Sequence, residues 1–244
     1  MKEFWFNGQC SSHFGMMATG SGVYNAPKRD IEIISIPGRN GLLTQDNGRF
    51  ENVTVKYPVS ITEDFAKNAE LARAWLMSSQ GYCRLEDDYD PDHFRMAMFQ
   101  GPLDFAMGQL NRYGEATISF SCKPQRFLKS GEIPITGNLA YCNPTSFPAR
   151  PLITVNLIGD GHITFHSTRK GVDNRVEFID MDGEIILDCE MKDAYRIVDG
   201  VYENMNSHIN TDDFIWLEPG YGAFIIGGDF ATNDMKIIPR WWTI

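Results

Sequence analysis

The chain has 244 residues, of which 43% are hydrophobic and 12% aromatic, so it can bury a sizeable core in one or two domains. Its formal net charge of -10 argues against nucleic-acid binding through counterion release, because that mechanism requires a basic surface. No apolar run reaches the roughly 18 residues of a membrane helix, and Lys2 and Glu3 precede only a short aromatic cluster. We therefore expect synthesis in the cytoplasm, no signal peptide and no insertion into a membrane.

The two halves of the chain differ in charge, and a segment rich in proline and glycine lies between them. Residues 1–130 contain 14 lysines and arginines against 15 acidic side chains, whereas residues 131–244 contain 8 against 17. Residues 131–151 also contain four prolines and two glycines, so they form either the connection between domains or irregular first strands of the second domain. We predict two domains, residues 1–134 and 135–244, that face different neighbours.

The first half predicts strands and one helix. Residues 30–36 alternate as a strand until Pro37-Gly38, and a loop is expected from there to residue 51. Residues 52–61 (NVTVKYPVSI) alternate strictly, as a sheet with one covered face requires. Further strands are expected at 94–99 and 116–122.

The predicted helix begins near Thr62, a good N-cap, and runs for about 18 residues. Its apolar face consists of Phe65, Ala69, Ala72 and Leu76, with Trp75 beside it. Gly81 suits a left-handed stop. Such a helix can brace a sheet but cannot enclose a cofactor on its own.

The residue pattern of the second half predicts β-strands throughout. Strands are expected at residues 152–158, 162–166, 176–181, 184–188, 194–198, 214–217, 222–226 and 235–238. Asp182-Gly183 and Asp199-Gly200 favour the positive φ angles of type I′ hairpin turns. Short strands with turn signals about every ten residues predict an antiparallel β-sandwich.

Motifs that would indicate a metal or an enzyme are incomplete. Asp88, Asp90 and Asp92 open like a calcium loop, but His93 replaces the turn glycine and Phe99 replaces the bidentate glutamate. We expect instead a solvated or interface turn in which Asp88 and Asp90 pair with Arg84 or Arg95.

The remaining candidate motifs also have simpler interpretations. His162 and His166 share a strand face without a third ligand nearby, so a histidine pair is favoured over zinc. The five cysteines are irregularly spaced and odd in number, which indicates free thiols. The chain has no G-x-S-x-G and no phosphate loop. We therefore predict no catalytic residues, no metal and no cofactor.

Two stretches are more informative when they are taken in order. The acidic run LEDDYDPDHFR (85–95) is followed by SFSCKPQRFL (119–128). Before them come Phe4-Trp5-Phe6-Asn7-Gly8, Phe14-Gly15, Pro27 with Arg29, Ile36-Pro37-Gly38-Arg39-Asn40-Gly41, Phe50-Glu51-Asn52, Trp75-Leu76 and Gly81-Tyr82; Asn143-Pro144 and Pro151-Leu152-Ile153 follow. In this order they resemble the distal tail protein (Dit) family of long-tailed phages and prophages of Gram-positive bacteria.

The resemblance implies a mainly β fold with one helix. The first domain would be a β-sandwich or split barrel that builds a ring, and the second a galectin-like antiparallel β-sandwich. It further implies a homohexamer at the virion tail tip that joins the tail tube protein to the tail-associated lysin or tail fibre and leaves a channel for DNA. Receptor-binding proteins are possible further partners within this family.

The resemblance also allows a test for sugar binding in the second domain. True galectins carry H-x-N-x-R and W-x-x-E-x-R, whereas this chain has Asp212 in the arginine position after His208 and Asn210. The spacing from Trp216 to Glu218 is also wrong. We therefore expect no binding of simple β-galactosides.

The candidate contact residues lie on irregular segments. We predict that Arg39 and Asn40, together with the acidic turn Asp87, Asp88, Asp90 and Asp92, contact other polypeptides rather than small ligands. A carbohydrate-binding module for host adhesion is the alternative function, and a glycan hydrolase is a third, because acidic pairs are abundant.

Overall fold

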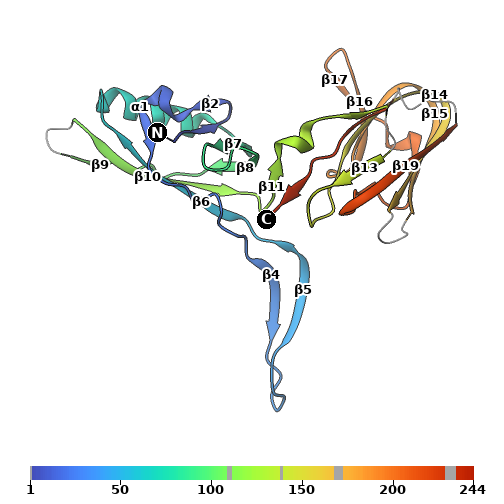
Figure 1. Cartoon of the computed structure of the whole chain (residues 1–244), viewed down its shortest axis with the longest axis horizontal. Coiled ribbons are helices and arrows are strands. Elements are labelled where there is room, and N and C mark those ends of the chain that lie inside the picture. Colours follow the sequence, from blue (N-terminus) through green and yellow to red (C-terminus); the bar gives the residue numbers. More distant parts are fainter. Residues whose placement is uncertain (1, 109–111, 138–139, 168–172, 229–234) are drawn as a thin grey trace. The chain divides into compact units, whose positions relative to one another are not determined.

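A computed structural model describes residues 2–108, 112–137, 140–167, 173–228 and 235–244. Within these ranges the chain is mainly β with one α-helix, as the sequence predicts (Figure 1). It divides into two compact units, Met1–Arg126 with Ile244 and Phe127–Thr243. No helix in the described ranges is long and apolar enough to span a membrane.

The first unit is built on one curled antiparallel sheet with the order β2-β1-β7-β8-β10-β6-β3. Its strands are β1 (Phe4–Phe6), β2 (Gln9–Cys10), β3 (Met16–Ala18), β6 (Val53–Ile61), β7 (Cys83–Asp87), β8 (His93–Phe99) and β10 (Gly114–Cys122), with β9 (Ala106–Met107) paired to β10. A bridge between Lys2 and Ala18 joins the segment before β1 to β3, near opposite ends of this order. The sheet therefore closes on itself as a split barrel.

The interior of this barrel follows the predicted alternation. Along β6 the residues Val53, Val55, Tyr57, Val59 and Ile61 are buried and the residues between them are not. Aromatic side chains from several strands meet them, since Phe4, Phe6 and Phe120 are also fully buried. A short 3₁₀-helix (Ser11–Phe14) and α1 pack against this core. The strand predicted over 52–61 is confirmed.

Helix α1 (Phe65–Ser78) is shorter than predicted. It has 14 residues and begins after Asp64, so the expected N-cap at Thr62 is wrong. Asp64 has a φ of 43°, a left-handed conformation that separates the helix from the end of β6 at Ile61. The predicted apolar face is correct, because Phe65, Ala69, Ala72, Trp75 and Leu76 are buried. Gly81 has a φ of 68°, as expected for a left-handed residue after the helix.

A hairpin of strands β4 (Arg29–Ile34) and β5 (Leu43–Phe50) forms a two-stranded sheet of its own (Figure 1). We call this hairpin, residues 29–50, the arm. The loop expected from Pro37 to residue 51 is therefore wrong over β5. Almost every arm residue is exposed, so neither face imposes the alternation by which strands are recognised in a sequence.

The second unit is an antiparallel β structure around two long strands, β14 (Leu152–Ser167) and β15 (Asp173–Asp188). The other elements are β12 (Ile135–Thr136), β13 (Ala140–Asn143), β16 (Asp193–Val198), β17 (Val201–Asn204), β18 (Ile209–Thr211), β19 (Gly220–Gly228), β20 (Met235–Ile238) and β21 (Trp242–Thr243), with 3₁₀-helices at Lys129–Glu132 and Asn206–His208. Strand β11 (Arg126–Leu128) begins in the first unit and continues in the second.

Three sequence expectations in this unit have different outcomes. Asp199-Gly200 connects β16 to β17 with φ angles of 50° and 79°, so that hairpin is confirmed. Asp182-Gly183 is not a turn, because both residues pair with β14 inside the continuous strand β15. Residues 214–217 form no strand; only Leu217 makes a bridge, to Ala149.

Candidate interaction sites

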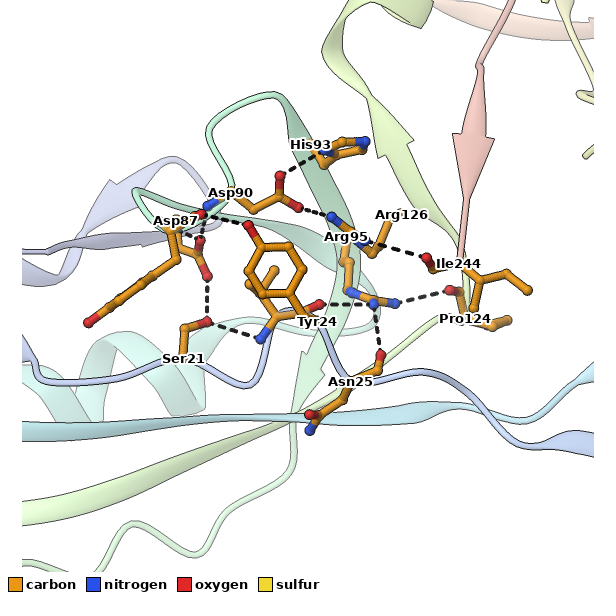
Figure 2. A network of polar contacts seen from close by, with 12 residues as sticks. Ser21, Tyr24, Asn25, Asp87, Asp90, His93, Arg95, Pro124, Arg126 and Ile244 are labelled. Atoms are coloured by element: carbon orange, nitrogen blue, oxygen red, sulfur yellow. Dashed lines mark hydrogen bonds and ion pairs between the residues drawn. The ribbon is translucent and has the colours of Figure 1, made fainter. Parts of the chain in front are cut away.

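The acidic turn after β7 is held by a network of buried hydrogen bonds (Figure 2). Asp87 is 4% exposed, and its carboxylate accepts hydrogen bonds from Ser21 Oγ at 2.8 Å and from Tyr57 Oη at 2.6 Å. The backbone N–H groups of Tyr89 and Asp90 donate to the other carboxylate oxygen at 2.9 Å each. Asp87 therefore fixes the turn to the barrel.

Asp90 is the second buried acid of this turn. It pairs with Arg126 through one carboxylate oxygen and with His93 Nδ1 at 2.8 Å through the other (Figure 2). Burial by itself raises the pKa of Asp90, but the hydrogen bonds from Arg126 and His93 outweigh this and lower it below its ordinary value. Asp90 is thus a charged structural residue.

Within the described residues Arg95 pairs with no acid, contrary to the sequence expectation. It is 2% exposed and donates hydrogen bonds to the carbonyls of Val23, Asn25, Lys123 and Pro124 at 3.0–3.4 Å. Figure 2 shows those to Asn25 and Pro124. Burial lowers its pKa to about 10, which still leaves the guanidinium charged at neutral pH. Val23 and Asn25 lie just before the arm, so Arg95 fixes the segment from which the arm departs.

The neighbouring charged groups have other partners. Arg84 pairs with Glu86, and the Asp88 carboxylate accepts a hydrogen bond from the backbone N–H of Glu3 at 3.0 Å. Asp88 and Asp90 find their partners far away in the sequence, at Glu3 and Arg126, which local spacing does not reveal. Asp92 is the member of the turn with an exposed side chain. Contact of this turn with another polypeptide stays a prediction, and Asp92 is its most accessible point.

Arg39 and Asn40 lie at the tip of the arm, between β4 and β5. The other two arginines of the arm are paired within it, Arg29 with Asp46 at 3.0 Å and Arg49 with Asp30 at 2.6 Å. In the described part of the chain, the Arg39 side chain has no ion-pair partner. The arm thus presents one uncompensated cation at its tip.

Aliphatic side chains accompany this cation. Ile33 is 61% and Leu42 59% exposed. The other exposed aliphatic residues of the arm are Ile31, Ile34, Ile36 and Leu43. Sequence reasoning missed this surface, although IEIISIPGRNGLL (31–43), an apolar run on each side of a glycine-rich turn, was a signal for a hairpin.

The second unit contains the residues considered for metal or sugar binding. In the described ranges, no group of three His, Cys, Asp or Glu side chains could hold a metal ion. His162 lies on β14, opposite Glu177 of β15 and Gly227 of β19. Asn210 donates to Glu177 at 3.1 Å, and Trp216 Nε1 donates to Glu218 at 3.0 Å. Asn210 and Trp216 of the galectin-like pattern are thus each bonded to a glutamate of the same unit.

Comparison with known proteins identifies the architecture. No family model and no curated protein matches the sequence. Among solved structures, the Dit (gp 19.1) protein of phage SPP1 has a TM-score of 0.72 at 11% identity, with 97% of each chain covered. That protein is described as a paradigm of the hub adsorption apparatus in phages that infect Gram-positive bacteria. The chain has the distal tail protein fold.

Two further structures support this assignment of the distal tail protein fold. Both are of the phage p2 baseplate in its activated conformation, one with Sr and one with Ca. Their TM-scores are 0.54 and 0.57 at 8% and 7% identity, and 97% of each chain is covered. The distal tail protein fold therefore extends over both units, including the second half, where the sequence motifs are sparse.

Proposed function

We propose that this chain is a structural subunit of a phage tail tip, which assembles through its arm into a closed ring of six copies. The observation that carries the proposal is the arm itself, which exposes aliphatic side chains and an unpaired arginine. The distal tail protein fold supports the same role.

The arm is expected to be only marginally stable in an isolated subunit. A two-stranded hairpin is marginally stable in water unless another surface covers it. Burial of each exposed isoleucine or leucine would contribute about 1.5 kcal/mol or more. An extended hairpin with apolar residues is therefore best explained as an element that packs on another chain.

The proposed contact joins two different surfaces, the arm of one copy and another surface of its neighbour, so it is heterologous. Such a contact builds a ring when its rotation closes and an open filament when it does not, and we propose the closed case. In the proposed assembly, one face of the ring contacts the tail tube protein and the other the tail-associated lysin or fibre. The ring leaves a channel for DNA, has no enzymatic activity, and is made in the host cytoplasm before it joins the virion.

Removal of the arm tests the proposal. In the variant, an Asn-Gly turn replaces residues 31–48 and joins Asp30 to Arg49, which are ion-paired at the base of the arm. We expect the full chain to sediment as a hexamer and the variant as a monomer with the same melting temperature. A variant that still forms hexamers would contradict the role given to the arm.

One observation favours adhesion as a second candidate function. A concave site of about 280 Å³ on the second unit is lined by Asp160, His162, Arg175 and Glu177, and Arg175 Nε donates to Glu177 at 3.0 Å. Planar polar groups of this kind bind sugar hydroxyls. Calorimetric titration with host cell-wall polysaccharide tests it: heat that is lost in Arg175→Ala supports adhesion, and the absence of heat contradicts it.

A further inference from the structure

We propose that Asn40, at the tip of the arm, is a site of spontaneous deamidation in the subunit before it assembles. The chain contains three Asn-Gly pairs, at residues 7–8, 40–41 and 47–48. A glycine after an asparagine favours this reaction, because no β-carbon obstructs the approach of the glycine backbone nitrogen to the asparagine side chain. The fold restrains two of the pairs and leaves the pair at Asn40 free to react.

The reaction is an intramolecular substitution at the side-chain amide of Asn40. The Gly41 backbone nitrogen loses its proton to solvent and attacks Cγ of Asn40. A bond forms between these two atoms, the bond from Cγ to Nδ2 breaks, and ammonia leaves with a proton from solvent. Water then opens the cyclic imide: cleavage at Cγ gives aspartate, and cleavage at the backbone carbonyl gives isoaspartate. Water is the sole co-reactant, and nothing is oxidised or reduced.

Asn40 and Gly41 can reach the geometry of attack. Both are exposed, in the connection beyond Ile34 and Leu43, the last paired residues of β4 and β5. In the part of the chain that the structure describes, neither the Asn40 side chain nor the Gly41 backbone N–H makes a hydrogen bond. Apart from its chain neighbours, no heavy atom lies within 4 Å of the position that a β-carbon of Gly41 would occupy. Neither bonding nor crowding restrains this pair.

The pair Asn47-Gly48 has the same two residues but is restrained within β5. Asn47 Nδ2 donates a hydrogen bond to the Asp30 carboxylate at 3.1 Å. The backbone N–H of Gly48 donates to the Asp46 carboxylate at 2.8 Å. The leaving amide and the attacking nitrogen are therefore both engaged. Breaking two such bonds should slow the reaction about tenfold, or about 1.4 kcal/mol.

The pair Asn7-Gly8 is held in the tight turn between the paired strands β1 and β2. Its φ angles are 51° and 75°. The backbone N–H of Asn7 donates to the Arg84 carbonyl at 3.0 Å, and the Asn7 side chain donates to Ser79 Oγ at 3.3 Å. Attack by Gly8 requires rotation about the Asn7 backbone and side chain, which these bonds oppose. Asn7 is therefore also expected to react more slowly than Asn40.

Deamidation changes the charge of the arm tip. Arg39 is the one charged side chain within residues 35–42. A new carboxylate at position 40 would bring the formal charge of this segment from that of one cation to zero. Isoaspartate would in addition insert a methylene group into the backbone. An aged subunit would thus differ at its arm tip from a newly made one.

Peptide mapping by mass spectrometry tests the site in the full chain, incubated at low concentration at pH 7 and at pH 9. At position 40 we expect two products of equal mass that separate on chromatography, aspartate and isoaspartate. They should form about tenfold faster than the products at positions 7 and 47. Both should form faster at pH 9, where more of the Gly41 nitrogen is deprotonated.

Two controls separate local structure from sequence. Asn40→Gln should remove the products at position 40 and leave those at positions 7 and 47 unchanged, because the longer side chain closes the ring poorly. In concentrated urea the three sites should react at similar rates. Conversion at Asn40 no faster than at Asn47 in the folded chain would overturn the inference, and so would a rate difference that persists in urea. Neither result depends on whether the chain forms rings, so the proposed function is tested separately.

Discussion

The hydroxyl of Tyr57 donates a 2.6 Å hydrogen bond to Asp87 in the interior of the first unit. It links β6, the strand that follows the arm, to the turn after β7. Burial chiefly, with the neighbouring carboxylate of Asp87, raises the pKa of Tyr57, so the phenol stays protonated and remains a donor. Removing a hydrogen-bond donor from a buried carboxylate lowers the free energy of unfolding, because the carboxylate stays buried with one bond fewer.

Tyr57→Phe should therefore lower the free energy of unfolding by about 1–3 kcal/mol, because Asp87 keeps its burial but loses a donor. Urea unfolding of the full chain measures the change. Tyr24→Phe is the matched control, since the Tyr24 hydroxyl donates to the Tyr89 carbonyl from a side chain that is 68% exposed. Equal losses in the two variants would contradict the structural role of the buried bond.

In the second unit, Asp188 accepts hydrogen bonds from both Nη groups of Arg240 at 2.8 and 3.0 Å. Burial raises the pKa of Asp188, but these bonds and those from the backbone N–H groups of Met191 and Glu190 outweigh it. They leave the pKa below its ordinary value of 3.8. A carboxyl with a depressed folded-state pKa stabilises the fold above its unfolded pKa and loses that effect as the pH falls through the folded value.

Asp188→Asn should thus destabilise the second unit at pH 7 by on the order of 3 kcal/mol, because Arg240 loses its charged partner. The difference between wild type and variant should shrink as the pH falls below 3.8. Thermal unfolding from pH 7 to pH 3 measures both effects. A difference that is constant or larger in acid would show that the ion pair is not its source.

Arg39→Ala should impair assembly and leave the melting temperature of the subunit nearly unchanged, because the side chain has no partner within its own chain in the described ranges. Sedimentation velocity and differential scanning calorimetry on the same samples separate the two effects. Arg49→Ala is a useful comparison, because Arg49 pairs with Asp30 within the arm. A large drop in melting temperature for Arg39→Ala would make Arg39 an internal structural residue.

The second unit, residues 127–243, should unfold cooperatively on its own and give no heat with lactose. Asp212 stands in the position of the arginine that galectins use, and Trp216 bonds to Glu218 instead of presenting a free indole N–H. A sugar there would lack a charge-assisted donor. Measurable heat from lactose would refute the motif argument.

The parts of the fold that could be predicted are those in which one face of an element is buried. The alternation along β6 and the apolar face of α1 follow from that constraint. Strand β5 could not be recognised in this way, because its sequence LTQDNGRF lies in a hairpin with both faces exposed. We propose that the apolar surface on which the arm packs belongs to another copy of the chain.

Long-range pairing explains the other differences. The same Asp-Gly dipeptide turns the chain at Asp199-Gly200 and lies inside a strand at Asp182-Gly183, because β14 and β15 pair continuously there. Likewise, Asp90 pairs with Arg126, 36 residues away, instead of with Arg95. Arg39 and Asn40 could be placed on a connection from the sequence, but only the structure shows that this connection is the tip of an arm.

The most direct test of the central claim is the solution mass of the full chain at several concentrations, combined with electron microscopy of the same sample. We predict a species six times the chain mass, with sixfold rotational symmetry and a central opening. A twofold dimer with an extensive apolar interface, or a strict monomer at the highest concentration reached, would contradict it.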